Sequence, residues 1–313
     1  MATPNYIDRG GELVFAPPFL ADKVDYYGFI IDADIQKLQA LCDRYLNAPL
    51  GAARFAPAGG FVLLACCNLP SLRSSTPPYS NWGWFAEREI AFWMLVIDKQ
   101  AKRIYWLLPY IWVDNPYAMA MGRELYGFPK GIGTVTLPAS PDNPDSFAID
   151  TLVLPTFSPE TKGEVVRLVE VKPTGERSHL TVSGTVNSLD DLAREIIHLL
   201  DDDLSLLGNA RLLLDSLDDL LHLRIPMVFL KEFRDVVKPA NTAFRAIVET
   251  KPFARNVYGV KIYENVFHAG ITPCASHPIA SDLGLSTTNP LPSYLSFWVN
   301  FDFEIGQGTQ TIA

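Results

Sequence analysis

The stretch Gly122-Arg-Glu-Leu-Tyr-Gly-Phe-Pro-Lys-Gly-Ile-Gly133 is what separates this sequence from that of a generic globular domain. It sets an aromatic-Pro-Lys step inside a glycine-rich turn, after a long apolar segment from Ile90 to Val113. Because buried strands read as continuous apolar runs, we expect the turn to leave a buried sheet with Lys130 at its mouth. Taken alone, a lysine among Gly and Pro is most simply an exposed turn residue.

The first nine residues of this stretch, which end at Lys130, resemble the active-site segment of the acetoacetate decarboxylase family. Members of that family carry Gly-Arg-Glu followed by an aromatic-Pro-Lys-Lys run. Their first lysine forms a Schiff base with a keto substrate, and the resemblance places that role on Lys130. Residues 225–231 and 277–283 are similar to further family motifs of lower specificity. The resemblance covers about residues 15 to 155 and 222 to 305.

The same resemblance implies the other groups of a substrate pocket. Phe85-Ala-Glu87 is similar to the family's aromatic-x-Glu, which places the carboxylate of Glu87 in the pocket as a proton-transfer group. An equally good interpretation makes Glu87 a structural partner of Arg88 or Arg123. We expect contacts with the substrate from Arg123, Tyr126, Phe128, Val62 and Phe85.

The sequence departs from the family pattern at three places. Gly131 stands where the family has its second lysine, the early arginine falls near Lys23-Val24, and the first pocket glutamate falls on Val62. A lysine of ordinary pKa, about 10.4, is a cation at neutral pH and cannot attack a carbonyl. Lys130 therefore needs burial, or a cation distant in sequence such as Arg123, to become neutral. The apolar replacements predict a substrate that is larger and less polar than acetoacetate.

Hydrophobic patterning predicts an α+β protein dominated by antiparallel sheet. The family resemblance adds that the sheet curls, barrel-like, around an interior pocket. We expect a helix that starts after Asp32 or Asp34 and ends at Pro49, and a short helix at 117–125. The Pro- and Ser-rich residues 69–79 are predicted to form a loop. Strands are expected at 26–31, 61–67, 90–97 and 104–113, over parts of 134–186, and at 227–233, 243–250, 257–263 and 293–303.

We expect a single domain over residues 1–313 with a helical insertion at about 187–222. The family resemblance says nothing about the insertion. Its leucines exceed one narrow apolar stripe, which suits either a surface for a second chain or a lid over the pocket. Asp201-Asp202-Asp203 more simply satisfies the positive end of a helix than it binds a metal, because metal ligands come from spaced positions.

Composition argues against several classes of function. A formal net charge of −9 without any basic run argues against nucleic-acid binding. No stretch approaches the roughly 18 apolar residues of a membrane span, and the N-terminus lacks a signal-peptide pattern. We therefore expect a cytoplasmic protein that does not bind membranes. The cysteines, Cys42, Cys66, Cys67 and Cys274, lack zinc-site spacing and are expected to be free thiols.

Three hypotheses for the function remain open. The first is a lyase that acts on a β-keto acid through an imine on Lys130, most simply a decarboxylase, with Glu87 assisting proton transfer. The second keeps the imine but performs aldol, dehydration or cyclisation chemistry on a larger ketone. The third is a small-molecule binding protein without catalysis. The imine chemistry needs no cofactor, no spacing of residues predicts a metal site, and the family resemblance implies a homo-oligomer.

Overall fold

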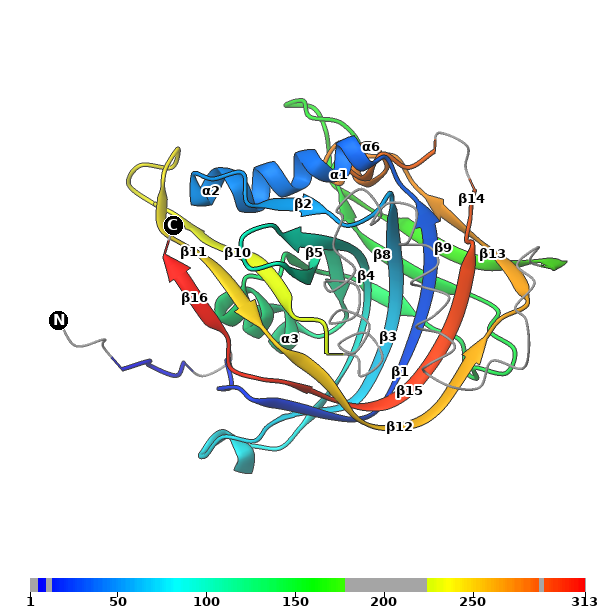
Figure 1. Cartoon of the computed structure of the whole chain (residues 1–313), viewed down its shortest axis with the longest axis horizontal. Helices are drawn as coiled ribbons and strands as arrows, with labels where there is room; N and C mark the ends of the chain where they lie inside the picture. Colours follow the sequence, from blue (N-terminus) through cyan, green and yellow to red (C-terminus); the bar gives the residue numbers. More distant parts are fainter. Residues whose placement is uncertain (1–4, 10–12, 178–223, 287–289, 313) are drawn as a thin grey trace.

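The computed structural model describes residues 5–9, 13–177, 224–286 and 290–312. The helical insertion expected at about 187–222 lies outside these residues. Two largely antiparallel sheets make up most of the described structure (Figure 1). The large sheet curls around an interior cavity, which confirms the prediction of an α+β protein built mainly from antiparallel sheet.

The large sheet has eleven strands, in the order β12-β15-β1-β3-β4-β5-β10-β11-β16, with β2 beside β4 and β6 beside β5. Its strands pair antiparallel except where β5 meets β6 and β10. The bounds are β1 (Phe19–Asp32), β2 (Phe55–Pro57), β3 (Phe61–Ser74), β4 (Phe85–Asp98), β5 (Arg103–Val113), β6 (Lys130–Ile132), β10 (Met227–Arg234), β11 (Thr242–Thr250), β12 (Pro252–Ile262), β15 (Leu295–Ile305) and β16 (Thr309–Ile312).

The second sheet has five strands in the order β14-β13-β9-β8-β7. They are β7 (Thr134–Thr136), β8 (Phe147–Val153), β9 (Glu164–Arg177), β13 (Asn265–Ile271) and β14 (Leu291–Pro292). The helical segments are short: α1 (Ile35–Cys42), η1 (Asp43–Asn47), α2 (Ala48–Leu50), η2 (Tyr79–Asn81), α3 (Pro116–Met121), η3 (Gly122–Tyr126) and α6 (Ile279–Leu283).

Alternation along the strands of the large sheet sends side chains into two separate cores. The inner core fills the curl of this sheet together with residues of α3, and it contains the cavity. The outer core joins the other face of the sheet to the five-stranded sheet, α1 and α6. Cys66 and Cys67 show the alternation directly, because the first lies in the outer core and the second in the inner core. Both are free thiols, as predicted.

Strand β3 is longer than the sequence indicates, and the loop predicted at 69–79 begins only after Ser74. Pro70 suggested a break because proline cannot donate to a ladder. The register of β3 against β4 shifts between Leu69 and Leu72, so Pro70 lies in an irregular stretch where a ladder bond is already missing. Pro109 is accommodated in the same way in β5, where the register shifts between Phe92 and Met94.

Helix α1 begins where the sequence indicates. The Asp34 carboxylate accepts hydrogen bonds from the backbone N–H groups of Gln36 and Lys37 at 2.7 and 3.2 Å, which satisfies two groups that the helix leaves unpaired. Pro49 does not end this helical segment, because it lies in the first turn of α2, where proline fits. The left-handed Gly51 ends it instead.

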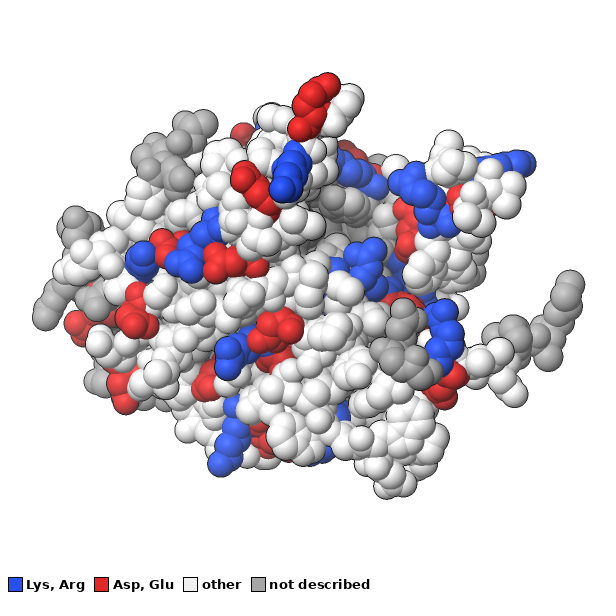
Figure 2. All heavy atoms as spheres, turned by 180° about the vertical axis from the view of Figure 1, so that it is seen from behind, with Lys and Arg blue, Asp and Glu red and all other residues white. Residues whose placement is uncertain are grey.

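No helix of the described residues is long and apolar enough to cross a membrane. On the face drawn in Figure 2, basic and acidic side chains are interspersed rather than gathered by sign. Several ion pairs connect neighbouring strands, as Arg167 does with Asp150 and Arg245 with Glu232. Exposed pairs of this kind contribute little to stability.

Candidate active site

The turn between α3 and β6 is built by local hydrogen bonds and by one glycine. Asn115 caps α3 by accepting from the backbone N–H groups of Tyr117 and Ala118. The chain then widens into the π-type turn η3 and reverses at Gly127, which has φ of 84°. A Cβ at Gly127 would lie 2.7 Å from the Cα of Lys231, so the position requires glycine for its backbone angle and for its contact with β10.

This turn sets Lys130 as the first residue of β6, where it pairs with Ile111 of β5. The lysine is 8% exposed, and its side chain points into the inner core. Its stem packs directly on Gly122, where a Cβ would lie 2.7 Å from the lysine Cδ. The first glycine of the quoted stretch therefore leaves the room that the lysine side chain occupies.

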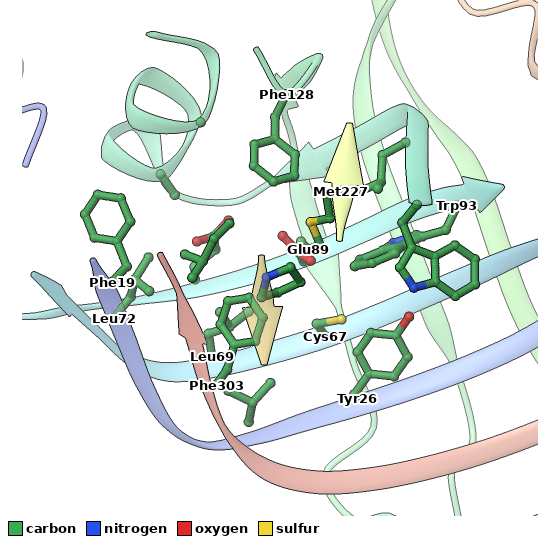
Figure 3. A pocket seen from close by; sticks show the side chains of 18 of the residues that line it. Phe19, Tyr26, Cys67, Leu69, Leu72, Glu89, Trp93, Phe128, Met227 and Phe303 are labelled. Atoms are coloured by element: carbon green, nitrogen blue, oxygen red, sulfur yellow. The ribbon is translucent and has the colours of Figure 1, made fainter. Parts of the chain in front are cut away.

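Lys130 opens onto a cavity of about 170 Å³. Figure 3 shows Phe19 and Leu72 towards one end, Trp93 and Tyr26 towards the other, and Glu89, Cys67 and Met227 between them. The walls are largely apolar, as in ordinary ligand sites. They include Phe19, Val24, Tyr26, Leu63, Cys67, Leu69, Glu87, Glu89, Trp93, Trp106, Met121, Gly122, Tyr126, Phe128, Met227, Phe297, Val299, Phe301 and Phe303.

Two carboxylates of β4 share the cavity with the amine. Lys130 Nζ donates to Oε1 of Glu87 at 2.5 Å and lies 3.9 Å from Oε2 of Glu89. The glutamates are two residues apart in one strand, so their side chains point to the same face. Cys67 is the cross-strand partner of Glu89 on β3, and its thiol also lines the cavity.

The carboxylates decide the charge of the amine. Burial acts to lower the pKa of Lys130, but the charges of Glu87 and Glu89 outweigh it and leave this pKa above its usual value. Burial raises the pKa of Glu89 to about 7, with Glu87 adding to the effect and Lys130 opposing it. The expectation that burial, or a distant cation such as Arg123, would make Lys130 neutral is thus wrong, because the two carboxylates favour the charged amine. The amine is buried as expected, but a carboxylate that can accept its proton is hydrogen-bonded to it.

Residues 12–152 match the sequence model of the acetoacetate decarboxylase family. This match covers somewhat under half of the 313 residues. No curated protein matches it by sequence. The likeness to solved structures extends over nearly the whole chain and, at these identities, supports the fold alone.

One similar structure is the acetoacetate decarboxylase of Legionella pneumophila, with a TM-score of 0.61 and 13% identity over 99% of this chain and 92% of that chain. An acetoacetate decarboxylase-like enzyme from Sphingomonas wittichii RW1 has a TM-score of 0.51 and 13% identity over 99% of each chain. The enduracididine biosynthesis enzyme MppR has a TM-score of 0.50 and 11% identity over 97% of this chain and 90% of that chain.

Two of the substrate contacts expected from the acetoacetate decarboxylase family lie on the cavity wall. The ring centroid of Phe128 is 5.5 Å from Lys130 Nζ, close enough for a cation–π contact. Tyr126 lines the cavity as well, but its hydroxyl donates to the Gly306 carbonyl at 2.9 Å. The phenol proton of Tyr126 is thus engaged by the backbone, which favours a packing role for this ring.

Three other expected contacts lie elsewhere. Val62 belongs to the outer core, and its neighbour Leu63 lines the cavity instead, because a shift of one residue along a strand reverses the face. Phe85 packs against the rings of Phe15 and Tyr117, outside the cavity lining. Arg123 is exposed, and its guanidinium donates to the Lys130 carbonyl at 3.2 Å. None of these three side chains is on the wall of the cavity around Lys130.

The remaining departures from the family pattern can be placed as well. Val24 lines the cavity while Lys23 is exposed, so an apolar side chain faces the site at the position of the family's early arginine. A Cβ at Gly131 would lie 3.0 Å from Trp112, which belongs to the outer core. A second lysine at this position would therefore point away from the cavity. His277 lies beside Trp112 and is not among the residues that line the cavity.

Sequence reasoning missed four polar groups of the cavity, those of Glu89, Cys67, Tyr26 and Trp93. The signal for Glu89 was present, because alternation from Glu87 places it on the same face. It was overlooked because the strand was expected to begin at Ile90, whereas β4 begins at Phe85. The other groups required the pairing of β1, β3 and β4, which one sequence does not reveal.

Proposed function

We propose that this chain is an enzyme that forms an imine between Lys130 and the carbonyl group of a keto compound bulkier and less polar than acetoacetate. The observation that carries the proposal is the buried Lys130 amine, which faces an apolar cavity and hydrogen-bonds to Glu87 at 2.5 Å. The match of residues 12–152 to the acetoacetate decarboxylase family model supports the same chemistry.

The first step is the release of the amine from its proton. Transfer of this proton from Nζ to Oε1 of Glu87 converts an ion pair into a neutral amine and a carboxylic acid. An apolar cavity reduces the cost of this conversion, because charges are poorly solvated there. The neutral amine then attacks the carbonyl carbon of the substrate, and the acid form of Glu87 returns a proton as water leaves.

The protonated imine accepts the electron pair of a bond that breaks next to it. For a β-keto acid, the bond to the carboxyl carbon breaks, carbon dioxide leaves, and the pair moves to the imine nitrogen as an enamine. A proton from the Glu89 carboxyl, whose pKa is raised to about 7, then completes the product carbon, and water hydrolyses the imine to release the ketone and return the lysine. This decarboxylation is the first candidate reaction because it is the family's own.

A second candidate follows from the charges of the cavity. Among the described lining residues, Lys130 is the one cationic side chain, whereas Glu87 and Glu89 are both acidic. A substrate carboxylate would thus meet two like charges and no arginine. This balance favours a neutral ketone, for which the imine would serve an aldol, dehydration or cyclisation step. A biosynthetic enzyme, MppR, has a similar fold.

Borohydride trapping tests the proposal. The protein is incubated with apolar ketones and β-keto acids, reduced, digested and mapped by mass spectrometry. The expected result is a reduced adduct on the peptide that contains Lys130, absent from Lys130→Ala. Release of carbon dioxide selects decarboxylation over the second candidate. Binding of the ketones without any adduct would overturn the enzyme and leave a small-molecule binding protein.

We also propose that the described strands belong to one domain and that the chain assembles with copies of itself in the cytoplasm, as the family resemblance implies. Light scattering coupled to size-exclusion chromatography measures the assembly. A mass equal to the 34.8 kDa of one chain would contradict the oligomer.

A further inference from the structure

The indole nitrogen of Trp93 is a buried donor without a hydrogen-bond partner among the described residues. Trp93 is 8% exposed and lines the cavity. Native proteins pair nearly all such groups, because burial removes the water that would otherwise accept the bond. An unpaired donor on the wall of a ligand cavity therefore points to an acceptor that arrives with the ligand.

The indole has apolar and aromatic neighbours. Its ring meets that of Tyr26 edge to face at 5.9 Å and that of Trp106 at 5.6 Å. Its cross-strand partner on β3 is Leu63. Two edge-to-face contacts hold the ring in a defined orientation, so the N–H group has a fixed position on the cavity wall.

The position of Trp93 on β4 sets its distance from the amine. Glu89, Ala91 and Trp93 alternate onto the inner face of the strand, and four residues of strand span about 13 Å. Ala91 projects only a methyl group between the two ends. Figure 3 shows Trp93 and Tyr26 together on the side of the cavity away from Phe19 and Leu72.

We propose that Trp93 Nε1 donates a hydrogen bond to a neutral oxygen at the end of the substrate distant from its keto group. The inference rests on the proposed function, because that function assigns the keto end to Lys130. An indole N–H can only donate, so the partner is an acceptor such as an ether, hydroxyl or carbonyl oxygen. Among the described lining residues, no cation other than Lys130 faces the cavity, so an anionic tail would be buried without a counter-charge.

A matched pair of probes tests this donor. 4-(4-Methoxyphenyl)butan-2-one and 4-(4-ethylphenyl)butan-2-one have nearly the same shape, and the first has an ether oxygen where the second has a methylene group. Their dissociation constants are measured by calorimetry on the full chain, in wild type and in Trp93→Phe. Trp106→Phe is the control, because it removes a neighbouring indole that also lines the cavity.

The preference for the ether over the hydrocarbon is expected to fall about fivefold in Trp93→Phe, the size of one ordinary hydrogen bond. It is expected to persist in Trp106→Phe. In proton NMR spectra, the indole N–H signal of Trp93 is the one that is missing from Trp93→Phe. In wild type this signal should move downfield when the ether binds, and not when the hydrocarbon binds. An unchanged preference in Trp93→Phe, or failure of both ketones to bind wild type, would overturn the inference.

The same titrations in Lys130→Met separate this inference from the proposed function, because that variant cannot form an imine. One outcome is that the preference for the ether survives in Lys130→Met while wild type gives no borohydride adduct. That result would refute the imine chemistry and still support Trp93 as a hydrogen-bond donor. An adduct on Lys130 together with an unchanged preference in Trp93→Phe would remove the donor and leave the imine chemistry.

Discussion

Replacing Glu89 by glutamine should change how the stability of the protein depends on pH. Burial raises the pKa of Glu89 from its usual 4.5 to about 7. Below pH 4.5 the carboxyl is protonated in both the folded and the unfolded chain, so its ionisation does not lower the free energy of unfolding. Between pH 4.5 and 7 the unfolded chain has lost this proton while the folded chain still holds it, so the free energy of unfolding falls as the pH rises.

Each pH unit in that window corresponds to about 1.4 kcal/mol, so ionisation of Glu89 costs the folded state about 3 kcal/mol above pH 7. The isoelectric point of about 5.1 makes the lower end of the window unsuitable, because proteins precipitate near zero net charge. Between pH 5.5 and 8.5 about 2 kcal/mol of the change remains. The glutamine of Glu89→Gln is neutral at every pH, so the free energy of unfolding of this variant does not fall by this amount.

Urea unfolding followed by tryptophan fluorescence measures the difference. The free energy of unfolding of Glu89→Gln minus that of wild type should rise by about 2 kcal/mol from pH 5.5 to 8.5. Glu164→Gln, at an exposed position of β9, is the matched control, and its difference should stay constant. Parallel curves for wild type and Glu89→Gln would refute the raised pKa, and with it the proton that the proposed mechanism takes from Glu89.

Three further changes give independent tests. Gly122→Ala places a Cβ 2.7 Å from the Lys130 stem, so the rate of borohydride trapping should fall at least about tenfold while the unfolding midpoint changes little. Gly131→Lys places a Cβ 3.0 Å from Trp112 and should lower the free energy of unfolding in urea by about 1–3 kcal/mol. The pH dependence of borohydride trapping should stay the same. A shift of that pH dependence would contradict the outward direction of residue 131. Asp98→Asn removes the buried charge that pairs with Arg54 and should lower the free energy of unfolding by about 3 kcal/mol. Asp145→Asn, at an exposed position, should lower it by less than about 0.5 kcal/mol. Equal urea midpoints for these two variants would contradict a stabilising ion pair.

How much the sequence predicted depends on the range over which each signal acts. Local signals were reliable: the cap at Asp34, the turn at Gly127 and the run that places Lys130 all depend on neighbours along the chain. Pro70 misled because its effect depends on a register shift against another strand. Val62 was expected in the cavity, but the neighbouring Leu63 lines it, because which face of β3 turns inward depends on its pairing with other strands.

The charge of the site was beyond the sequence for a different reason. Burial of Lys130 was expected, but the pKa of a buried amine depends on the groups within a few ångströms of it. The β4 carboxylates reach Lys130 because β5 pairs with both β4 and β6, and Cys67 faces Glu89 because β3 and β4 pair in one particular register. A single sequence carries no direct record of that register.

The separation of the two cores along each strand also matters for protein engineering. On β3, Leu63 and Cys67 face the ligand space, while Leu64 and Cys66 hold the two sheets together. A combinatorial library confined to the first set can reshape ligand preference while the scaffold keeps its own contacts. Odd and even positions of one strand thus offer two nearly independent design problems, one of selectivity and one of robustness.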